Sequence, residues 1–181
     1  MRLFAGLKVP ALAQERLVRL QGGLAGARWR PEENFHITLQ FYDEVPAQNL
    51  PALEDALQQI SFPVLDLQVS GLGTFGRKKP FVLWAGADGA DTHDQKNLRE
   101  LARNCFNAGR SAGLALQSSN YRPHITLAYC KNSRQEDIAR YLQENNGFSA
   151  FDFTCGEFAL YLSRLGKHPS RYEIIAEFPC S

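Results

Sequence analysis

Two hydrophobic periods alternate along the chain, and each predicts a different kind of element. In residues 35–42, FHITLQFY, every second side chain is apolar, which is the pattern of a strand with one buried face. In residues 91–110 the apolar side chains instead recur three or four positions apart, which predicts an amphipathic helix. Asp91 or Thr92 is placed to cap the start of this helix.

The same patterns predict further elements in both halves of the chain. Ser133, three residues before Glu136, predicts a capping box at the start of the last helix. Residues 71–80, GLGTFGRKKP, are predicted to form a loop. The order of elements predicts an α+β fold with mainly antiparallel sheets flanked by helices. Strands are predicted at residues 2–9, 62–70, 81–85, 121–129, 151–163 and 171–178, and helices at 10–21, 46–60 and 133–146.

A short repeat links the two halves. His-Ile-Thr-Leu occurs at residues 36–39 and again at residues 124–127, about half the chain length apart. A duplicated strand-helix unit would explain this spacing, so we expect two pseudo-symmetric lobes with one HxT motif in each. The lobes are expected to form a single intertwined domain over residues 1–181, with a central cleft that carries both motifs.

The polar face of each repeated strand carries one imidazole and one hydroxyl. Residues i and i+2 of a strand point the same way, so His36 lies beside Thr38, and His124 lies beside Thr126. Packing does not require this match, because only the isoleucine and leucine positions serve the core. Two imidazoles that face one substrate suit phosphodiester chemistry, since a neutral one accepts a proton while a charged one donates a proton. The threonine hydroxyls would donate hydrogen bonds to the phosphate oxygens.

Composition changes this picture little. The chain has 181 residues, 44% of them hydrophobic, and its net charge of +1 argues against a strongly basic nucleic-acid coat. No apolar run reaches the roughly 18 residues of a membrane-spanning helix, and the start, MRLFAGLKVP, is interpreted as a strand and not as a signal peptide. Neither a metal nor a cofactor is expected, because no acidic cluster or third ligand accompanies either histidine. The cysteines form no CxxC pair and are interpreted as free thiols of a cytoplasmic protein: Cys105, Cys130, Cys155 and Cys180.

Basic residues offer candidate phosphate contacts. Arg122 precedes Pro123, which restricts it to an extended conformation and favours the same strand face as His124. An anion-binding role is therefore predicted for Arg122. The basic loop 77–79 is either a solvated turn or a contact for RNA phosphates. Four further aromatic residues are expected to take no part in the site, His93 and His168 as solvated side chains and Trp29 and Trp84 as core residues.

The paired motifs resemble those of the 2H phosphoesterases. More narrowly, the chain resembles the bacterial RNA 2′,3′-cyclic phosphodiesterases, also called 2′-5′ RNA ligases. The resemblance spans nearly the whole chain, in the segments RLFAGLKVP, RWRPEENFHITLQF, GTFGRKKPFVLWAG, RPHITLAY and LYLSRLGKHPSRYEII.

The resemblance implies metal-independent hydrolysis of a terminal 2′,3′-cyclic phosphate on RNA to a 2′-phosphomonoester, with reversible 2′-5′ ligation in some members. It implies that His36 donates a proton and His124 accepts one, while Thr38 and Thr126 hold the phosphate. The two motifs are too alike to distinguish donor from acceptor by themselves. The expected partners are RNA ends or nucleotides with a 2′,3′-cyclic phosphate, and no membrane partner is expected. The sequence does not determine the oligomeric state, and a monomer is the favoured expectation.

The chain departs from the resemblance at one position. Many members carry an arginine where this chain has Tyr129, and either Arg122 or Lys131 is the candidate to replace that cation, with strand parity favouring Arg122. Two other functions stay open at this point. One is a 2H phosphodiesterase that acts on 2′-5′ oligonucleotides or small cyclic nucleotide phosphates, and the other is a non-catalytic module that binds RNA ends.

Overall fold

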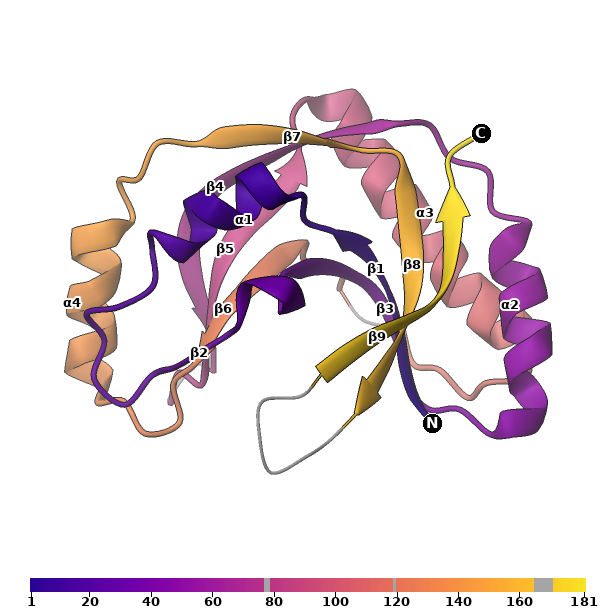
Figure 1. Cartoon of the computed structure of the whole chain (residues 1–181), viewed down its shortest axis with the longest axis horizontal. Coiled ribbons are helices and arrows are strands. Elements are labelled where there is room, and N and C mark those ends of the chain that lie inside the picture. The colour runs from indigo at the N-terminus through magenta and orange to yellow at the C-terminus, as the bar shows by residue number, and fades with distance from the viewer. Residues whose placement is uncertain (77–78, 119, 165–170) are drawn as a thin grey trace.

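The computed structural model describes residues 1–76, 79–118, 120–164 and 171–181. Within these residues the chain forms an α+β fold (Figure 1). The α-helices are α1 (Ala11–Val18), α2 (Leu50–Gln58), α3 (Thr92–Ser111) and α4 (Gln135–Asn145). The strands are β1 (Arg2–Lys8), β2 (Arg28–Trp29), β3 (His36–Glu44), β4 (Leu65–Phe75), β5 (Val82–Gly89), β6 (His124–Tyr129), β7 (Phe151–Cys155), β8 (Glu157–Arg164) and β9 (Arg171–Pro179).

The strands of the described residues join in one antiparallel sheet. Its order is β7-β4-β5-β6-β3-β1-β8-β9, and the two-residue β2 pairs with β6. Each half of the sheet holds one HxT strand, and β3 and β6 meet at its centre. The prediction of an α+β fold with antiparallel strands is confirmed, and the two halves share a single curled sheet. The C-terminal strands β8 and β9 return to the half that contains β1.

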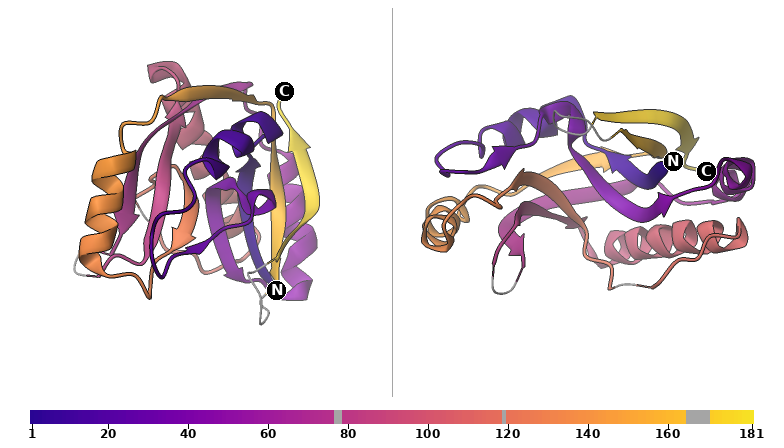
Figure 2. Two further views of the ribbon diagram at one scale, coloured as in Figure 1. Left: turned by 60° about the vertical axis from the view of Figure 1, so that its left-hand side comes forward. Right: turned by 90° about the horizontal axis from the view of Figure 1, so that it is seen from below.

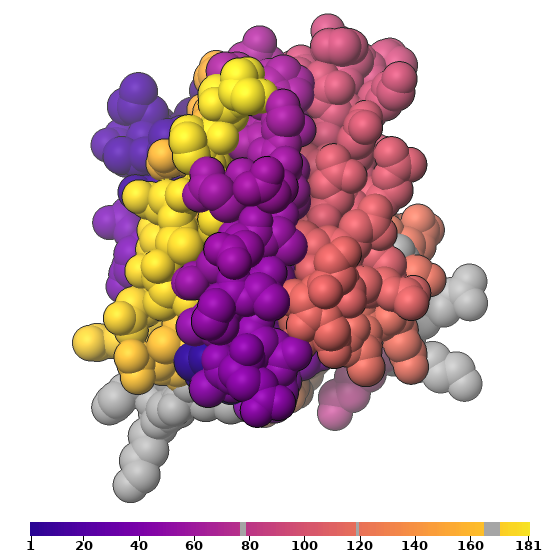
Figure 3. Space-filling view, turned by 90° about the vertical axis from the view of Figure 1, so that its right-hand side faces the viewer, coloured from indigo at the N-terminus to yellow at the C-terminus, as the bar shows by residue number. Residues whose placement is uncertain are grey.

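Four helices flank this sheet within the described residues. Helix α3 packs against β3, β4 and β5, whereas α1 contacts β7 and α4 contacts β4. Figure 2 shows α3 on one side of the sheet and α1 on the other. Figure 3 shows α2 between α3 and the C-terminal strand β9, and both of these elements contact α2. No helix of the described residues is long and apolar enough to cross a membrane.

Strand alternation divides the buried side chains between two faces of the sheet. The main core contains Leu3 and Leu7 of β1 together with Ile37 and Ile125 from the two HxT strands. Phe4, which points the other way from Leu3, belongs to a separate small cluster with side chains of β8. The apolar positions of the HxT strands therefore serve the core, while their histidines face away from it.

Three details of the sequence-based assignment are wrong. Residues 71–75 continue β4 and are not part of a loop. Ser133 makes no capping bond, because α4 begins at Gln135 with Arg134 at its N-cap, and the Oγ of Ser133 is buried without a partner. Strand β6 begins only at His124, since Pro123 has no N–H to give to the sheet, so strand parity does not extend back to Arg122.

The start of α3 gives a first testable prediction. The side chain of Asp91 accepts a hydrogen bond of 2.8 Å from the backbone N–H of Asp94, which satisfies one free donor of the first turn. Asp91→Ala should therefore lower the free energy of unfolding by about 1 kcal/mol. Thr92→Ala is the matched control and should change it little, because Thr92 already lies inside the helix. Urea unfolding measures both variants, and an equal cost at Thr92 would contradict the assignment of the cap.

Candidate active site

The candidate site is built on the contact between β3 and β6. These strands pair antiparallel with Ile37 opposite Ile125, the central residues of the two HxT motifs. In such a pair the residues one step to either side lie opposite each other on the other face of the sheet. The pairing thus places His36 across from Thr126 and Thr38 across from His124. The predicted convergence of the two motifs follows from this register, which relates them by a local twofold axis.

The imidazole of His36 is held at both ring nitrogens. Its Nδ1 lies 2.7 Å from the backbone oxygen of Asn34, and its Nε2 lies 3.0 Å from Oγ1 of Thr38. A carbonyl oxygen only accepts hydrogen bonds, so Nδ1 carries the hydrogen and Nε2 is the nitrogen left for a substrate. Aromatic rings surround the imidazole at centroid distances of 4.7 Å for Phe4 and 5.1 Å for Tyr172.

His124 repeats this arrangement in the other motif. Its Nδ1 lies 2.7 Å from the backbone oxygen of Arg122, which is again the residue two positions earlier. Nδ1 therefore carries the hydrogen here as well, and the lone pair lies on Nε2. Phe75 meets the ring edge-on at a centroid distance of 4.8 Å, and Trp84 lies at 6.1 Å. Trp84 thus borders the histidine and is not the core residue that its apolar strand predicted, whereas Trp29 does pack against the core.

Burial lowers the pKa of both histidines. For His36 loss of solvent lowers the pKa to about 4, although the hydrogen bond to Asn34 opposes this shift, and the charges of Arg30 and His124 lower it further. For His124 loss of solvent also lowers the pKa, the hydrogen bond to Arg122 raises it, and the charge of Arg122 lowers it. Each imidazole is thus neutral near pH 7 before an anion binds. The charge of His124 is among the influences that lower the pKa of His36, so the two rings lie close enough to interact.

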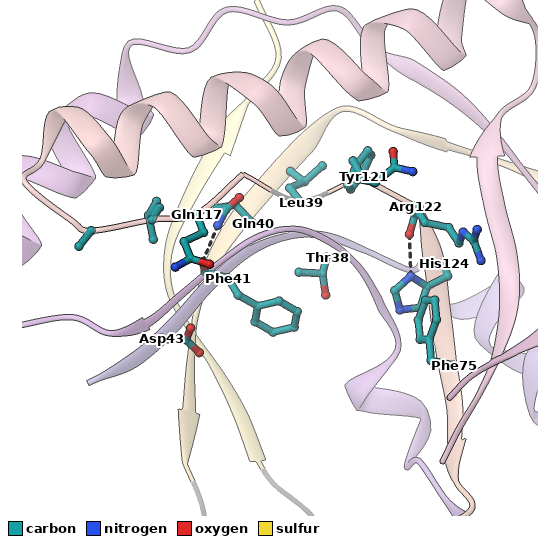
Figure 4. A pocket seen from close by; sticks show the side chains of 13 residues that line it. Thr38, Leu39, Gln40, Phe41, Asp43, Phe75, Gln117, Tyr121, Arg122 and His124 are labelled. Atoms are coloured by element: carbon teal, nitrogen blue, oxygen red, sulfur yellow. Dashed lines mark hydrogen bonds between the residues drawn. The ribbon is translucent and has the colours of Figure 1, made fainter. Parts of the chain in front are cut away.

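A cavity of about 730 Å³ opens beside His124. Thr38 and His124 point into the same space, as Figure 4 shows. Figure 4 also shows the guanidinium of Arg122 on the side of His124 that faces away from Thr38. The lining combines aromatic and amide side chains from separate elements, among them Phe41, Phe75, Gln40, Gln117 and Asn120.

The remaining predicted residues lie as follows. Thr126 is half-buried on β6, opposite Trp84 of β5. His93 is exposed at the start of α3, as predicted. Lys79 is exposed, whereas Arg77, Lys78 and His168 lie outside the described residues. The described residues contain no group of three or more His, Cys, Asp or Glu side chains placed to hold a metal.

Sequence reasoning missed a local irregularity that shapes the site. Leu83 pairs with Ala128 but its neighbour Trp84 pairs with Thr126, so Leu127 is an extra residue on β6. Both Leu127 and Ala128 are buried, and Tyr129 returns to the face that carries Thr126. Two adjacent apolar residues in LAY are the sequence signal of this bulge.

Arg30 is the second feature that sequence reasoning missed. It follows β2, and its backbone N–H donates a 2.8 Å hydrogen bond to the oxygen of Leu127. Arg28 and Arg30 are two positions apart, so both project to one face, and both guanidinium groups lie 5.5 Å from the centroid of the Tyr129 ring. Arg28 of β2 and Arg30, which follows it, therefore both place positive charge next to Tyr129.

The 2H resemblance implied a two-lobed α+β fold, and the α+β fold with antiparallel strands agrees with it, although both halves share one sheet. The sequence pattern of the family described as LigT like Phosphoesterase matches residues 7–84 and 91–172, so the chain belongs to this family. An RNA 2′,3′-cyclic phosphodiesterase of Geobacillus stearothermophilus is 30% identical over 97% of this chain, which spans only 56% of that relative. An RNA 2′,3′-cyclic phosphodiesterase of Thermotoga maritima is 29% identical, over 94% of this chain and 88% of the relative.

Solved structures share the fold. The crystal structure of E. coli LigT in apo form superimposes with a TM-score of 0.79, covering 99% of this chain and 97% of that chain at 21% sequence identity. At this identity the similarity establishes the fold alone.

The pKa of His36 predicts how stability depends on pH. The folded pKa of about 4 lies below the ordinary value of 6.5, so the unfolded chain binds more protons between these values. This difference in pKa contributes up to about 3 kcal/mol to the free energy of unfolding above pH 6.5, and the contribution is lost as the pH falls toward 4. His36→Gln should remove this loss, so the free energy of unfolding of the wild type should approach or fall below that of the variant at low pH. Urea unfolding from pH 7 to pH 4 measures it.

His93→Gln is the matched control, since that histidine is exposed. It should leave the pH dependence of wild-type unfolding intact. An acid limb that is the same in His36→Gln as in the wild type would contradict the buried neutral state of His36.

Proposed function

We propose that this protein hydrolyses the terminal 2′,3′-cyclic phosphate of RNA to a 2′-phosphomonoester. The observation that carries the proposal is the matched tethering of two opposed imidazoles. Both donate from Nδ1 to the carbonyl two residues earlier, so each presents Nε2 toward the shared face. The RNA 2′,3′-cyclic phosphodiesterases of Geobacillus stearothermophilus and Thermotoga maritima, which are relatives of this chain, support the same chemistry.

The surroundings of the histidines support one assignment of roles. His124 lines the large cavity, where water has access, and fits the base that takes a proton from the attacking water. His36 is enclosed by aromatic rings and fits the acid, because a proton on it is released toward the departing oxygen and not into solvent. This agrees with the roles that the resemblance implies.

The atoms and protons of the reaction then balance. Water attacks phosphorus and gives a proton to Nε2 of His124, while the bond from phosphorus to O3′ breaks and O3′ takes the proton of His36. The product carries a 2′-phosphate and a 3′-hydroxyl. Thr38 and Thr126 flank the two imidazoles, which supports a role for their hydroxyls as hydrogen-bond donors to the non-bridging oxygens, where negative charge resides in the transition state. The Thr38 hydroxyl contacts Nε2 of His36 in the free protein and becomes available when that nitrogen carries a proton.

His36 has to take up a proton from solution when the substrate binds. In the free protein its pKa of about 4 keeps this ring neutral near pH 7. An anionic phosphate beside the ring favours the charged form and raises the pKa. Binding of the cyclic phosphate thus charges the acid that the reaction needs, and the neighbouring cavity, with Phe41 and Phe75 among its lining, has room for the attached nucleoside.

Replacement of either histidine tests the proposal. The purified protein should convert RNA ending in a 2′,3′-cyclic phosphate to the 2′-phosphate in the presence of EDTA, since no metal takes part in the steps above. His36→Ala and His124→Ala should each reduce kcat by roughly 10²–10⁴-fold, the usual contribution of a general acid or base. Thr38→Val and Thr126→Val should each cost about 10–10³-fold through the loss of a transition-state donor.

Circular dichroism and thermal unfolding serve as the controls that each variant is folded. Mapping of the product phosphate to O2′ or O3′ distinguishes the proposed reaction from other phosphodiester chemistry. Conversion only of 2′-5′ oligonucleotides, or binding of RNA ends without turnover, would replace the proposal with one of the alternatives. Wild-type rates in a folded histidine variant would overturn the mechanism.

The lowered pKa values also predict a difference between two pH profiles. The profile of kcat/KM reports the free enzyme, so its bell should be centred below the ordinary histidine value of 6.5, because burial lowers the pKa of both rings. The profile of kcat reports the enzyme with phosphate bound, and its centre should lie at higher pH, because the anion favours charged imidazole. Initial rates from pH 4 to pH 9 measure both. Coincident profiles would show that the substrate does not charge a histidine.

A further inference from the structure

Arg30 combines burial, charge and an unused hydrogen-bonding capacity next to the candidate site. Only 4% of the residue is exposed, and its Nη2 atom is enclosed without any hydrogen-bond partner. Within the described part of the chain no carboxylate forms an ion pair with it. Burial of a cation without a counter-anion is costly, and an enclosed donor without a partner adds to that cost.

The neighbours of Arg30 connect it to the face of the sheet that carries the two histidines. Its guanidinium lies 5.1 Å from the ring centroid of Tyr172, and that ring meets the imidazole of His36 edge-on at 5.1 Å. On the other side it lies 5.5 Å from the centroid of Tyr129. The backbone bond of Arg30 to Leu127 places it one residue from Thr126 along β6. The guanidinium therefore lies between the two tyrosine rings, one of which contacts the imidazole of His36.

We propose that Arg30 is a substrate-binding residue of this site and supplies the cation that binds the phosphate group of the RNA end. The inference rests on the proposed function and names a contact for it. A planar guanidinium presents parallel N–H donors that match two oxygens of one phosphate, which a point charge does not. The Tyr129 and Tyr172 rings keep that plane in place through cation–π contacts.

Arg30 also links the protonation of His36 to the presence of bound phosphate. Loss of solvent is the main cause of the lowered pKa of His36, and the positive charge of Arg30 lowers this pKa further, so the histidine is neutral while the site is empty. A phosphate bound between the two offsets the charge of Arg30 and favours the proton on His36. The charged and titratable groups around His36 that take part in this balance are Arg30, His124, Tyr161, Tyr172 and Lys8, its neighbour on β1.

A purely structural role is the competing explanation, since a cation between two aromatic rings also stabilises the fold. Arg30→Met keeps most of the side-chain volume and removes the charge, Arg30→Lys keeps the charge and removes the planar fork, and Arg28→Gln is the matched control. Arg28 shares the Tyr129 ring but is exposed. Inorganic phosphate is the probe, and its binding is followed by NMR through the imidazole signals of His36 and His124.

Arg30→Met should weaken phosphate binding by about 10- to 100-fold, because a charge-assisted hydrogen bond is lost. Arg30→Lys should show a smaller loss, and Arg28→Gln should stay within about twofold of wild type. The pKa of His36 in the free protein should rise in Arg30→Met, as a neighbouring positive charge is gone. A purely structural role would change the unfolding temperature and leave the phosphate affinity unaltered.

The wild-type protein gives a second measurement if Arg30→Met fails to fold. The Nε–H signal of Arg30 should shift when phosphate is added, and an unchanged signal while the histidine signals respond would overturn the inference. So would unaltered phosphate affinity in folded Arg30→Met. These readouts need no turnover, so a protein that binds phosphate through Arg30 yet does not cleave cyclic-phosphate RNA would refute the proposed function and leave this contact intact.

Discussion

The pairing of Ile37 with Ile125 is the constraint on which the site depends. These two side chains are buried in the core, so the register of β3 against β6 is fixed by packing. A slip of one residue would turn the isoleucines out and the histidines in, which the core does not permit. The same contact that stabilises the centre of the sheet thereby places two imidazoles and two hydroxyls on its other face. Stability and catalytic geometry have one origin here.

Desolvation is the cost of that geometry, and it sets the chemistry of the empty site. Each imidazole loses solvent and becomes a weaker base, while a buried arginine adds positive charge nearby. The cluster therefore has a strong preference for one kind of ligand, an anion that neutralises cationic charge and accepts hydrogen bonds. A 2′,3′-cyclic phosphodiester meets both conditions, and in the proposed mechanism its negative charge favours the proton on the histidine that acts as the acid. In this proposal one electrostatic interaction, between the anion and the positive charges of the site, both selects the ligand and favours the protonated histidine.

The sequence predicted most of the fold and the centre of the site, because both depend on regular periodicity. Alternation identified the HxT strands and the face on which His36 and His124 lie. It could not place Tyr129 on the face that carries Thr126, because the extra residue in β6 reverses the alternation beyond Thr126. Nor could it place Arg30, whose importance arises from contacts with rings far away in the sequence. RWR before Pro31 does contain alternating basic residues, but nothing local distinguishes them from solvated side chains.

The repeated motifs are symmetric, whereas their surroundings are not, and this difference gives each histidine its own task. Both rings share the same tether to a carbonyl two residues earlier. His36, however, is packed against Phe4 and Tyr172 and is influenced by Arg30, while His124 opens onto a cavity of about 730 Å³. Hydrolysis of a phosphodiester needs a general base that accepts a proton from water and a general acid that donates a proton to the departing oxygen. In the proposed mechanism the repeated motif supplies two similar imidazoles, and their different surroundings separate the acid from the base.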